Sequence, residues 1–134
     1  MLIFSSDKKR YVDIGTADNW ICLYSTIVKR LGEKQEWRAA LSFLKTGACS
    51  AGDGYETAKQ LNLIRDKLSQ LSPDQVVYDL NDPKRPVPWK DNLSPVITSC
   101  GNYFTTSDGK DMLFELVSIL CYAQIMNVSI ASLD

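Results

Sequence analysis

The chain has 134 residues, of which 45% are hydrophobic and 23% charged, and it contains no histidine. This composition is typical of one ordinary globular domain over residues 1–134, and the lack of histidine excludes histidine-dependent triads and the commonest metal ligand. The net charge of −1 is uneven: residues 1–73 carry 11 Lys/Arg and 8 Asp/Glu, whereas residues 74–134 carry 4 and 8. Neither part is basic enough to predict nucleic-acid binding. The acidic part is either ordinary surface or a face for a basic partner.

The four cysteines, Cys22, Cys49, Cys100 and Cys121, are far apart and form no Cys-x-x-Cys pair. We therefore expect free thiols in a reducing cytoplasm, with neither a disulfide framework nor a zinc site. After Met1 only residues 2–4 are apolar before charged residues begin. This pattern predicts neither an export signal nor a membrane anchor.

The first elements follow from hydrophobic periodicity. Residues 2–14 favour a strand or a hairpin, with a turn in the middle. From Trp20 to Leu31, apolar residues recur at i, i+3, i+4, i+7, i+8 and i+11, which predicts a helix with one continuous buried face. Thr16 or Asp18 is expected to cap this helix, and Gly32 is placed to end it.

Two further helices are predicted over residues 36–45 and 53–71, the second starting with Asp53 and Glu56 at capping-box spacing. The Gln-Val-Val-Tyr-Asp-Leu run of residues 75–80 has the strongest strand pattern of the chain. The next segment, ending at Trp89, has three prolines in six residues. It is predicted to be extended and stiff, and to be held in place by Trp89.

Residues 112–123 contain only two polar side chains, Glu115 and Ser118, which predicts a core helix covered on all sides, Phe114 included. Ser107 or Asp108 is expected to cap it, with Asp111 adding negative charge to its first turn. Residues 103–105 and 127–131 are predicted to form short strands before and after it. Together these elements predict an α+β fold, with about four helices around this buried C-terminal helix and a small, mostly antiparallel sheet.

Few residues are candidates for catalysis. The carboxylate pairs Asp79 with Asp82 and Asp108 with Asp111 would need to face each other across a cleft. A strand end, a turn and a helix start explain them more simply, so we assign no catalytic residue and no metal or cofactor. A hydrolase that uses Asp108 and Asp111 remains an alternative. Trp89 is either a plug over the core or an exposed anchor for a partner.

Two blocks carry a resemblance to a known family. They are SPDQVVYDLNDPKRPVPWKDNLS (Ser72–Ser94) and NYFTTSDGKDMLFEL (Asn102–Leu116). In this order they resemble the immunity protein 70 family, small cytosolic proteins of bacterial polymorphic-toxin systems. The resemblance covers about half the chain well, while the N-terminal half agrees mainly in helix order.

The resemblance implies an antitoxin that binds and neutralises the C-terminal domain of a cognate toxin, such as a nuclease of a contact-dependent growth inhibition system. No nucleic acid, membrane or cofactor is then expected to bind. The alternative is a non-catalytic adaptor module with an unrelated protein partner; the oligomeric state stays open. For the antitoxin, the expected partner-binding residues are Asp79, Asp82, Trp89, Asp91, Tyr103 and Asp108. The alternative is that these shared residues only hold the proline-rich segment against the core helix.

Overall fold

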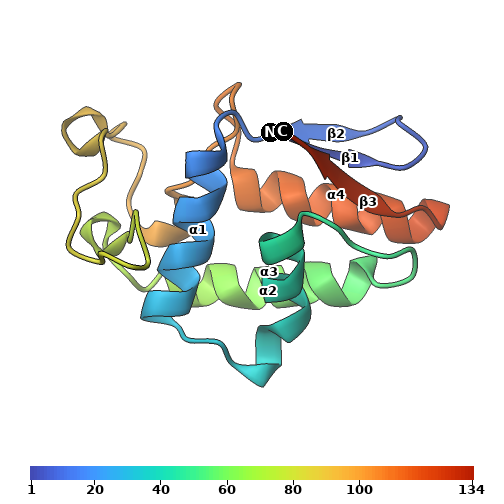
Figure 1. Cartoon of the computed structure of the whole chain (residues 1–134), viewed down its shortest axis with the longest axis horizontal. Helices are drawn as coiled ribbons and strands as arrows, with labels where there is room; N and C mark the ends of the chain where they lie inside the picture. Colours follow the sequence, from blue (N-terminus) through green and yellow to red (C-terminus); the bar gives the residue numbers. More distant parts are fainter.

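The predicted N-terminal hairpin is present in the computed structural model, which describes all residues from 1 to 134. Strand β1 (Leu2–Ser5) pairs antiparallel with β2 (Tyr11–Asp13), and β3 (Ile130–Leu133) pairs antiparallel with the other side of β1. The sheet order is therefore β2-β1-β3, and the two chain ends lie next to each other (Figure 1). Strand β3 lies further along the chain than predicted, because Asn127 adopts a left-handed conformation (φ 54°) that ends the preceding helix.

Four α-helices accompany the sheet and confirm the α+β prediction. They are α1 (Ala17–Arg30), α2 (Arg38–Thr46), α3 (Gly54–Leu68) and α4 (Met112–Met126). Four short 3-10 turns connect them: η1 (Gln35–Trp37), η2 (Pro73–Gln75), η3 (Lys90–Asn92) and η4 (Cys100–Asn102). Figure 1 shows α3 and α4 side by side beneath the sheet, with α1 and α2 crossing them. All four helices and the sheet contribute to one hydrophobic core.

The α1 periodicity predicts its buried face correctly. Trp20, Leu23 and Ile27 are buried, and Trp20 Nε1 donates to the Leu44 carbonyl oxygen over 2.6 Å. The helix ends as predicted at Gly32, whose φ of +88° is strained for any residue with a Cβ.

Helices α3 and α4 form the closest helix pair, and they run antiparallel. At one end Gly54 lies so close to α4 that a Cβ there would overlap the carbonyl oxygen of Leu120. At the other end Arg65 forms a 2.6 Å ion pair with Asp111. Asp111 also accepts the backbone N–H of Phe114 over 3.2 Å and is the N-cap of α4. The predicted cap at Ser107 or Asp108 is therefore wrong by a few residues.

Helix α4 is less enclosed than its apolar sequence predicts. Leu116 and Leu120 are fully buried, but Phe114 is 58% exposed and Ile125 69% exposed. Val117 and Cys121 are only partly buried. The physical reason is that α3 and a three-stranded sheet cover only part of the helix surface, so one apolar stripe stays at the surface.

The strand predicted over residues 75–80 does not form. Val77 is buried, but its N–H donates to the Thr26 hydroxyl over 2.9 Å, and its carbonyl accepts from Cys22 Sγ over 3.4 Å. The extended segment therefore bonds to α1 side chains instead of to a neighbouring strand. A run of apolar residues fits either environment, so the sequence pattern alone does not separate them.

Two smaller predictions also differ from the structure. The proline-rich segment is not extended throughout, because hydrogen bonds from Asp82 N to Asp79 O (3.0 Å) and from Arg85 N to Asp82 O (3.0 Å) close two successive turns. The strand predicted over residues 103–105 is reduced to a single bridge between Thr105 and Asp111.

Candidate partner-binding face

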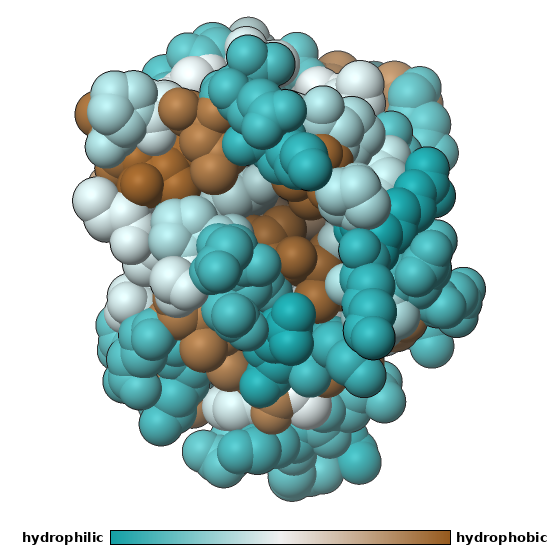
Figure 2. Space-filling view, turned by 90° about the vertical axis from the view of Figure 1, so that its left-hand side faces the viewer, coloured by the Kyte–Doolittle hydropathy of each residue, from teal (hydrophilic) through white to brown (hydrophobic).

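Residues 76–99 form one flank of the molecule, seen on the left of Figure 1. Apart from the 3-10 turn η3, this segment has neither helix nor strand. Its apolar side chains include Val96, which is 73% exposed, and Leu93, which is 37% exposed. Figure 2 looks onto this flank and shows hydrophobic residues lying open among hydrophilic ones, with a hollow near the centre. Exposed apolar groups within a polar rim are typical of protein-binding surfaces.

Trp89 and Tyr103 fix the segment to the core. Trp89 Nε1 donates to the Tyr103 hydroxyl over 2.6 Å. Tyr103 is only 5% exposed and packs against Phe104 with ring centroids 5.1 Å apart. Burial raises the pKa of Tyr103, so its hydroxyl remains protonated at neutral pH. Trp89 is thus held as predicted, while part of its indole stays accessible.

A second contact chain reaches outward from Trp89. Its ring meets Tyr78 edge-on at 5.7 Å, and the Arg85 guanidinium lies 4.9 Å from the Tyr78 ring centre. Arg85 also approaches Asp79 at 3.6 Å. These contacts order the first part of the proline-rich segment, although each surface ion pair or cation–π contact contributes only about 0.5–1 kcal/mol.

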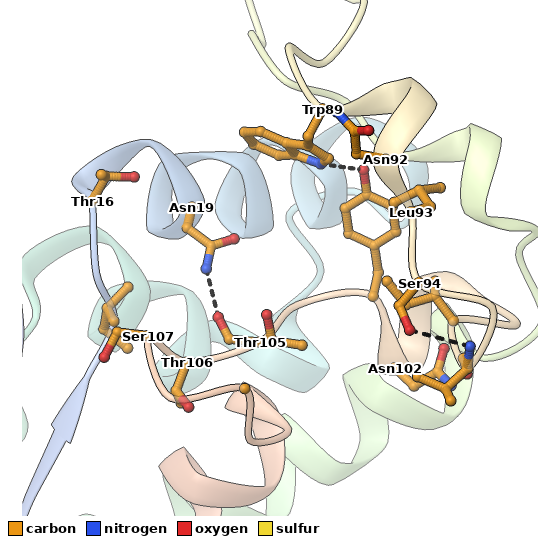
Figure 3. Close-up of a pocket in the computed structure, with 15 residues that line it drawn as sticks. Thr16, Asn19, Trp89, Asn92, Leu93, Ser94, Asn102, Thr105, Thr106 and Ser107 are labelled. Atoms are coloured by element: carbon orange, nitrogen blue, oxygen red, sulfur yellow. Dashed lines mark hydrogen bonds between the residues drawn. The ribbon is translucent and has the colours of Figure 1, made fainter.

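A pocket of about 580 Å³, which we call the polar pocket, lies between this segment and the start of α1 (Figure 3). None of its 15 lining residues has a charged side chain. Those with hydroxyl or amide side chains are Thr16, Asn19, Asn92, Ser94, Asn102, Tyr103, Thr105, Thr106 and Ser107, and the others are Ile14, Trp89, Leu93, Val96, Ile97 and Gly109. Asn19 spans the pocket floor by donating to the Thr105 carbonyl over 2.7 Å. Neutral donors and acceptors beside an indole suit the main-chain and amide groups of a peptide.

The turn before α4 forms the far wall of the polar pocket. The Thr106 hydroxyl donates to Asp108 and accepts the Lys110 N–H over 3.0 Å. The hydrogen bond from Thr106 lowers the pKa of the Asp108 carboxyl. The Asp108 carboxylate also lies 3.5 Å from Lys110 Nζ. The Asp111 carboxylate accepts the Phe114 N–H as the N-cap of α4 and forms an ion pair with Arg65. Both carboxylates therefore have structural partners that hold the turn and the helix start.

The structure brings some of the six predicted residues together. Trp89 and Tyr103 are in contact, and Ser107 and Gly109, the neighbours of Asp108, line the same polar pocket as Trp89. Asp79, Asp82 and Asp91 belong to the 76–99 segment but do not line this pocket. Asp82 and Asp91 are exposed and take part in no ion pair. Tyr103 lies beneath Trp89, where little of it is accessible. Whether the six bind a partner stays a prediction.

Two features of this flank are not predicted from the sequence. The polar pocket combines residues from three separate stretches of the chain, so no local sequence motif predicts it. Residues 74–134 have more acidic than basic side chains, yet they contain a cluster of basic ones. Three of the four Lys/Arg residues in that part, Lys84, Arg85 and Lys90, fall within seven positions. The spacing of these cations was the available signal.

The sequence matches the family model described as Immunity protein 70 over residues 4–131 of 134. The chain belongs to the Immunity protein 70 family. The match includes the N-terminal helices as well as the two blocks that carry the resemblance. No curated protein and no solved structure matches the chain.

Membership of the Immunity protein 70 family implies an immunity protein directed against a toxin, and hence a protein partner. None of the helices is long and apolar enough to cross a membrane. No three or more His, Cys, Asp or Glu side chains are grouped in a way that would hold a metal ion.

Cys22 and Cys100 are buried free thiols, and burial raises the pKa of the Cys22 thiol to about 12 and that of the Cys100 thiol to about 11.

Proposed function

We propose that this Immunity protein 70 family member is a cytoplasmic antitoxin that binds the C-terminal domain of a cognate toxin and blocks it without catalysis. A nuclease of a contact-dependent growth inhibition system is the partner we favour. The match over residues 4–131 is the observation that carries the proposal. The binding face we assign consists of the 76–99 segment and the turn around Asp108.

The chemistry of this face supports the assignment. It combines a partly exposed Trp89, exposed Leu93 and Val96, and carboxylates at Asp82 and Asp91 that have no ion-pair partner. Tryptophan is enriched among the residues that dominate binding energy, and unpaired carboxylates complement the basic substrate site of a nuclease. A stable complex would bury about 1,600 Å² in total.

Co-expression with the toxin tests the proposal. A neighbouring reading frame that encodes a toxin C-terminal domain immediately upstream would itself support the proposal. That domain is expressed alone and together with the chain, and cell survival is measured. Survival only with the chain supports an antitoxin. Continued killing when the chain is expressed and folded contradicts it. A pull-down dominated by an unrelated housekeeping protein would instead favour an adaptor.

Charge reversal then tests the face. We expect Asp82→Lys combined with Asp91→Lys to slow toxin association and to weaken its salt dependence, because both carboxylates would face a basic surface. Glu33→Lys combined with Glu36→Lys, at two exposed positions between α1 and α2, changes the net charge by the same amount; it is the matched control and should leave association unchanged. Stopped-flow mixing at several salt concentrations measures both quantities. An association rate unchanged by the double reversal would show that these carboxylates serve only solvation.

A further inference from the structure

A second hollow, which we call the basic groove, lies on the other side of the Trp89–Tyr103 contact. Its volume is about 800 Å³, and Leu93 and Tyr103 line both it and the polar pocket. Four cationic side chains line the groove: Arg30 from the end of α1, Lys84 and Arg85 from the proline-rich segment, and Lys90 from η3. The only carboxylate among the lining residues is Asp74.

Most of this positive charge is not neutralised within the protein. Arg30, Lys84 and Lys90 take part in no ion pair. Arg30 donates through Nε to the Gln75 carbonyl over 2.8 Å, which positions its guanidinium without cancelling its charge. Arg85 shares its charge with Asp79 at 3.6 Å. The groove is therefore a local basic site on a chain whose net charge is −1.

The walls of the groove are apolar and stiff. Pro73, Pro83 and Pro86 line it together with Val76 and Val87. Proline fixes φ, so walls built from it lose little conformational entropy when a ligand binds. A ligand that fits this groove needs negative charge for the cations at the rim and apolar side chains for the walls.

From this geometry we infer that the basic groove receives an acidic, extended segment of the toxin domain that also carries apolar side chains. The inference rests on the proposed function for the identity of the partner, and adds a second contact site of opposite charge beside Asp82 and Asp91. A nucleic-acid strand is a poorer match, because its bases need aromatic surfaces for stacking and the only aromatic ring lining the groove is that of the buried Tyr103. The acidic and basic side chains that follow one another along residues 79–91 of this chain would also fix the register of the complex.

A peptide titration tests the groove without any toxin. The 15N-labelled chain is titrated with the blocked peptide Glu-Glu-Leu-Glu-Glu and, as control, with Gln-Gln-Leu-Gln-Gln. We expect saturable shifts of the amide signals of Val76, Lys84, Arg85, Val87, Trp89 and Lys90 with the acidic peptide only, and their loss in the Lys84→Glu/Lys90→Glu variant. Absent or scattered shifts would overturn the inference. A single-stranded oligonucleotide that produces the same shifts at lower concentration would overturn it in favour of nucleic acid.

A measurement of binding to the toxin domain is the second test of the groove. Lys84→Glu/Lys90→Glu should raise the dissociation constant at least about tenfold. Lys59→Glu/Lys67→Glu, on the exposed side of α3, is the matched control and should bind like the wild type. Thermal unfolding confirms that both variants fold.

The two proposals fail in different ways. If the wild-type chain neither binds the toxin nor protects cells, the proposed function fails. The peptide titration then still shows whether the groove binds acidic peptides in preference to neutral ones. If the wild type protects and the Lys84→Glu/Lys90→Glu variant binds the toxin equally tightly, the groove inference alone is wrong.

Discussion

The attachment of residues 76–99 to α1 depends on one buried hydroxyl, and Thr26→Val removes it while keeping the side-chain shape. The Thr26 hydroxyl donates to the Cys22 carbonyl over 2.8 Å and accepts the Val77 N–H over 2.9 Å. Thr26 and Val77 are both fully buried. After the change the Val77 carbonyl still accepts from Cys22 Sγ, but the Val77 N–H has no partner.

The expected cost follows from that orphaned donor. A buried backbone N–H without an acceptor costs about 1–3 kcal/mol, whereas threonine and valine differ little in helix propensity. For a stability of about 5–15 kcal/mol and a urea slope of about 1–3 kcal/mol per M, the unfolding midpoint should fall by roughly 1 M. Equilibrium urea unfolding followed by tryptophan fluorescence measures this shift.

Thr46→Val is the matched control. The Thr46 hydroxyl also donates to the carbonyl four residues earlier (2.9 Å) and accepts the Ala48 N–H over 3.2 Å, but it is exposed. Water replaces the lost bonds there, so we expect a change within about 0.5 kcal/mol. If Thr26→Val and Thr46→Val are equally mild, the buried hydroxyl does not anchor the segment and the reasoning is refuted.

Three further changes test the core and the acid response. Gly54→Ala, at the first residue of α3, gains less than the roughly 1 kcal/mol of helix propensity of an interior position and places its Cβ on the Leu120 carbonyl, so we expect a net loss of about 1–3 kcal/mol in urea unfolding; a gain would contradict the close packing of α3 and α4. Leu116→Ala, at a fully buried position, should cost about 2–5 kcal/mol, and a negligible change would contradict its burial. The hydrogen bond from Ser5 is the main cause that lowers the pKa of Asp7 from 3.8 to about 2. Because the folded-state pKa is depressed, this contribution to stability is present above about pH 4 and is lost as the pH falls towards 2. Asp7→Asn should flatten the acid-side stability profile, and an unchanged profile would refute the assignment.

The elements that local periodicity determines were predictable. The α1 face from Trp20 to Leu31 and the hairpin of residues 2–14 formed as expected, because their patterns repeat over several turns or strand residues. The predicted strand at residues 75–80 failed because the acceptor of the Val77 N–H is a side chain from another element. The prediction that α4 is covered on all sides was wrong for a related reason. Sequence shows that Phe114 is apolar but not how far the neighbouring sheet extends.

The proposed binding face was predictable only in part. The proline-rich segment pinned by Trp89 follows from local composition, and its hydrogen bond to Tyr103 explains why both residues stand out. The two hollows beside that contact were not predictable, since each joins residues from distant stretches. Counting charges over residues 74–134 gave an acidic balance, whereas the fold gathers Lys84 and Lys90 with Arg30 into a basic groove.

The most direct test of the account is hydrogen exchange on the chain, alone and with the purified toxin domain. We predict a complex in which exchange slows across residues 76–99 and in the turn around Asp108, while α2 (Arg38–Thr46) exchanges as in the free protein. The absence of a complex, or protection confined to α2 and its surroundings, would contradict the central claim that this flank is the surface that recognises the toxin.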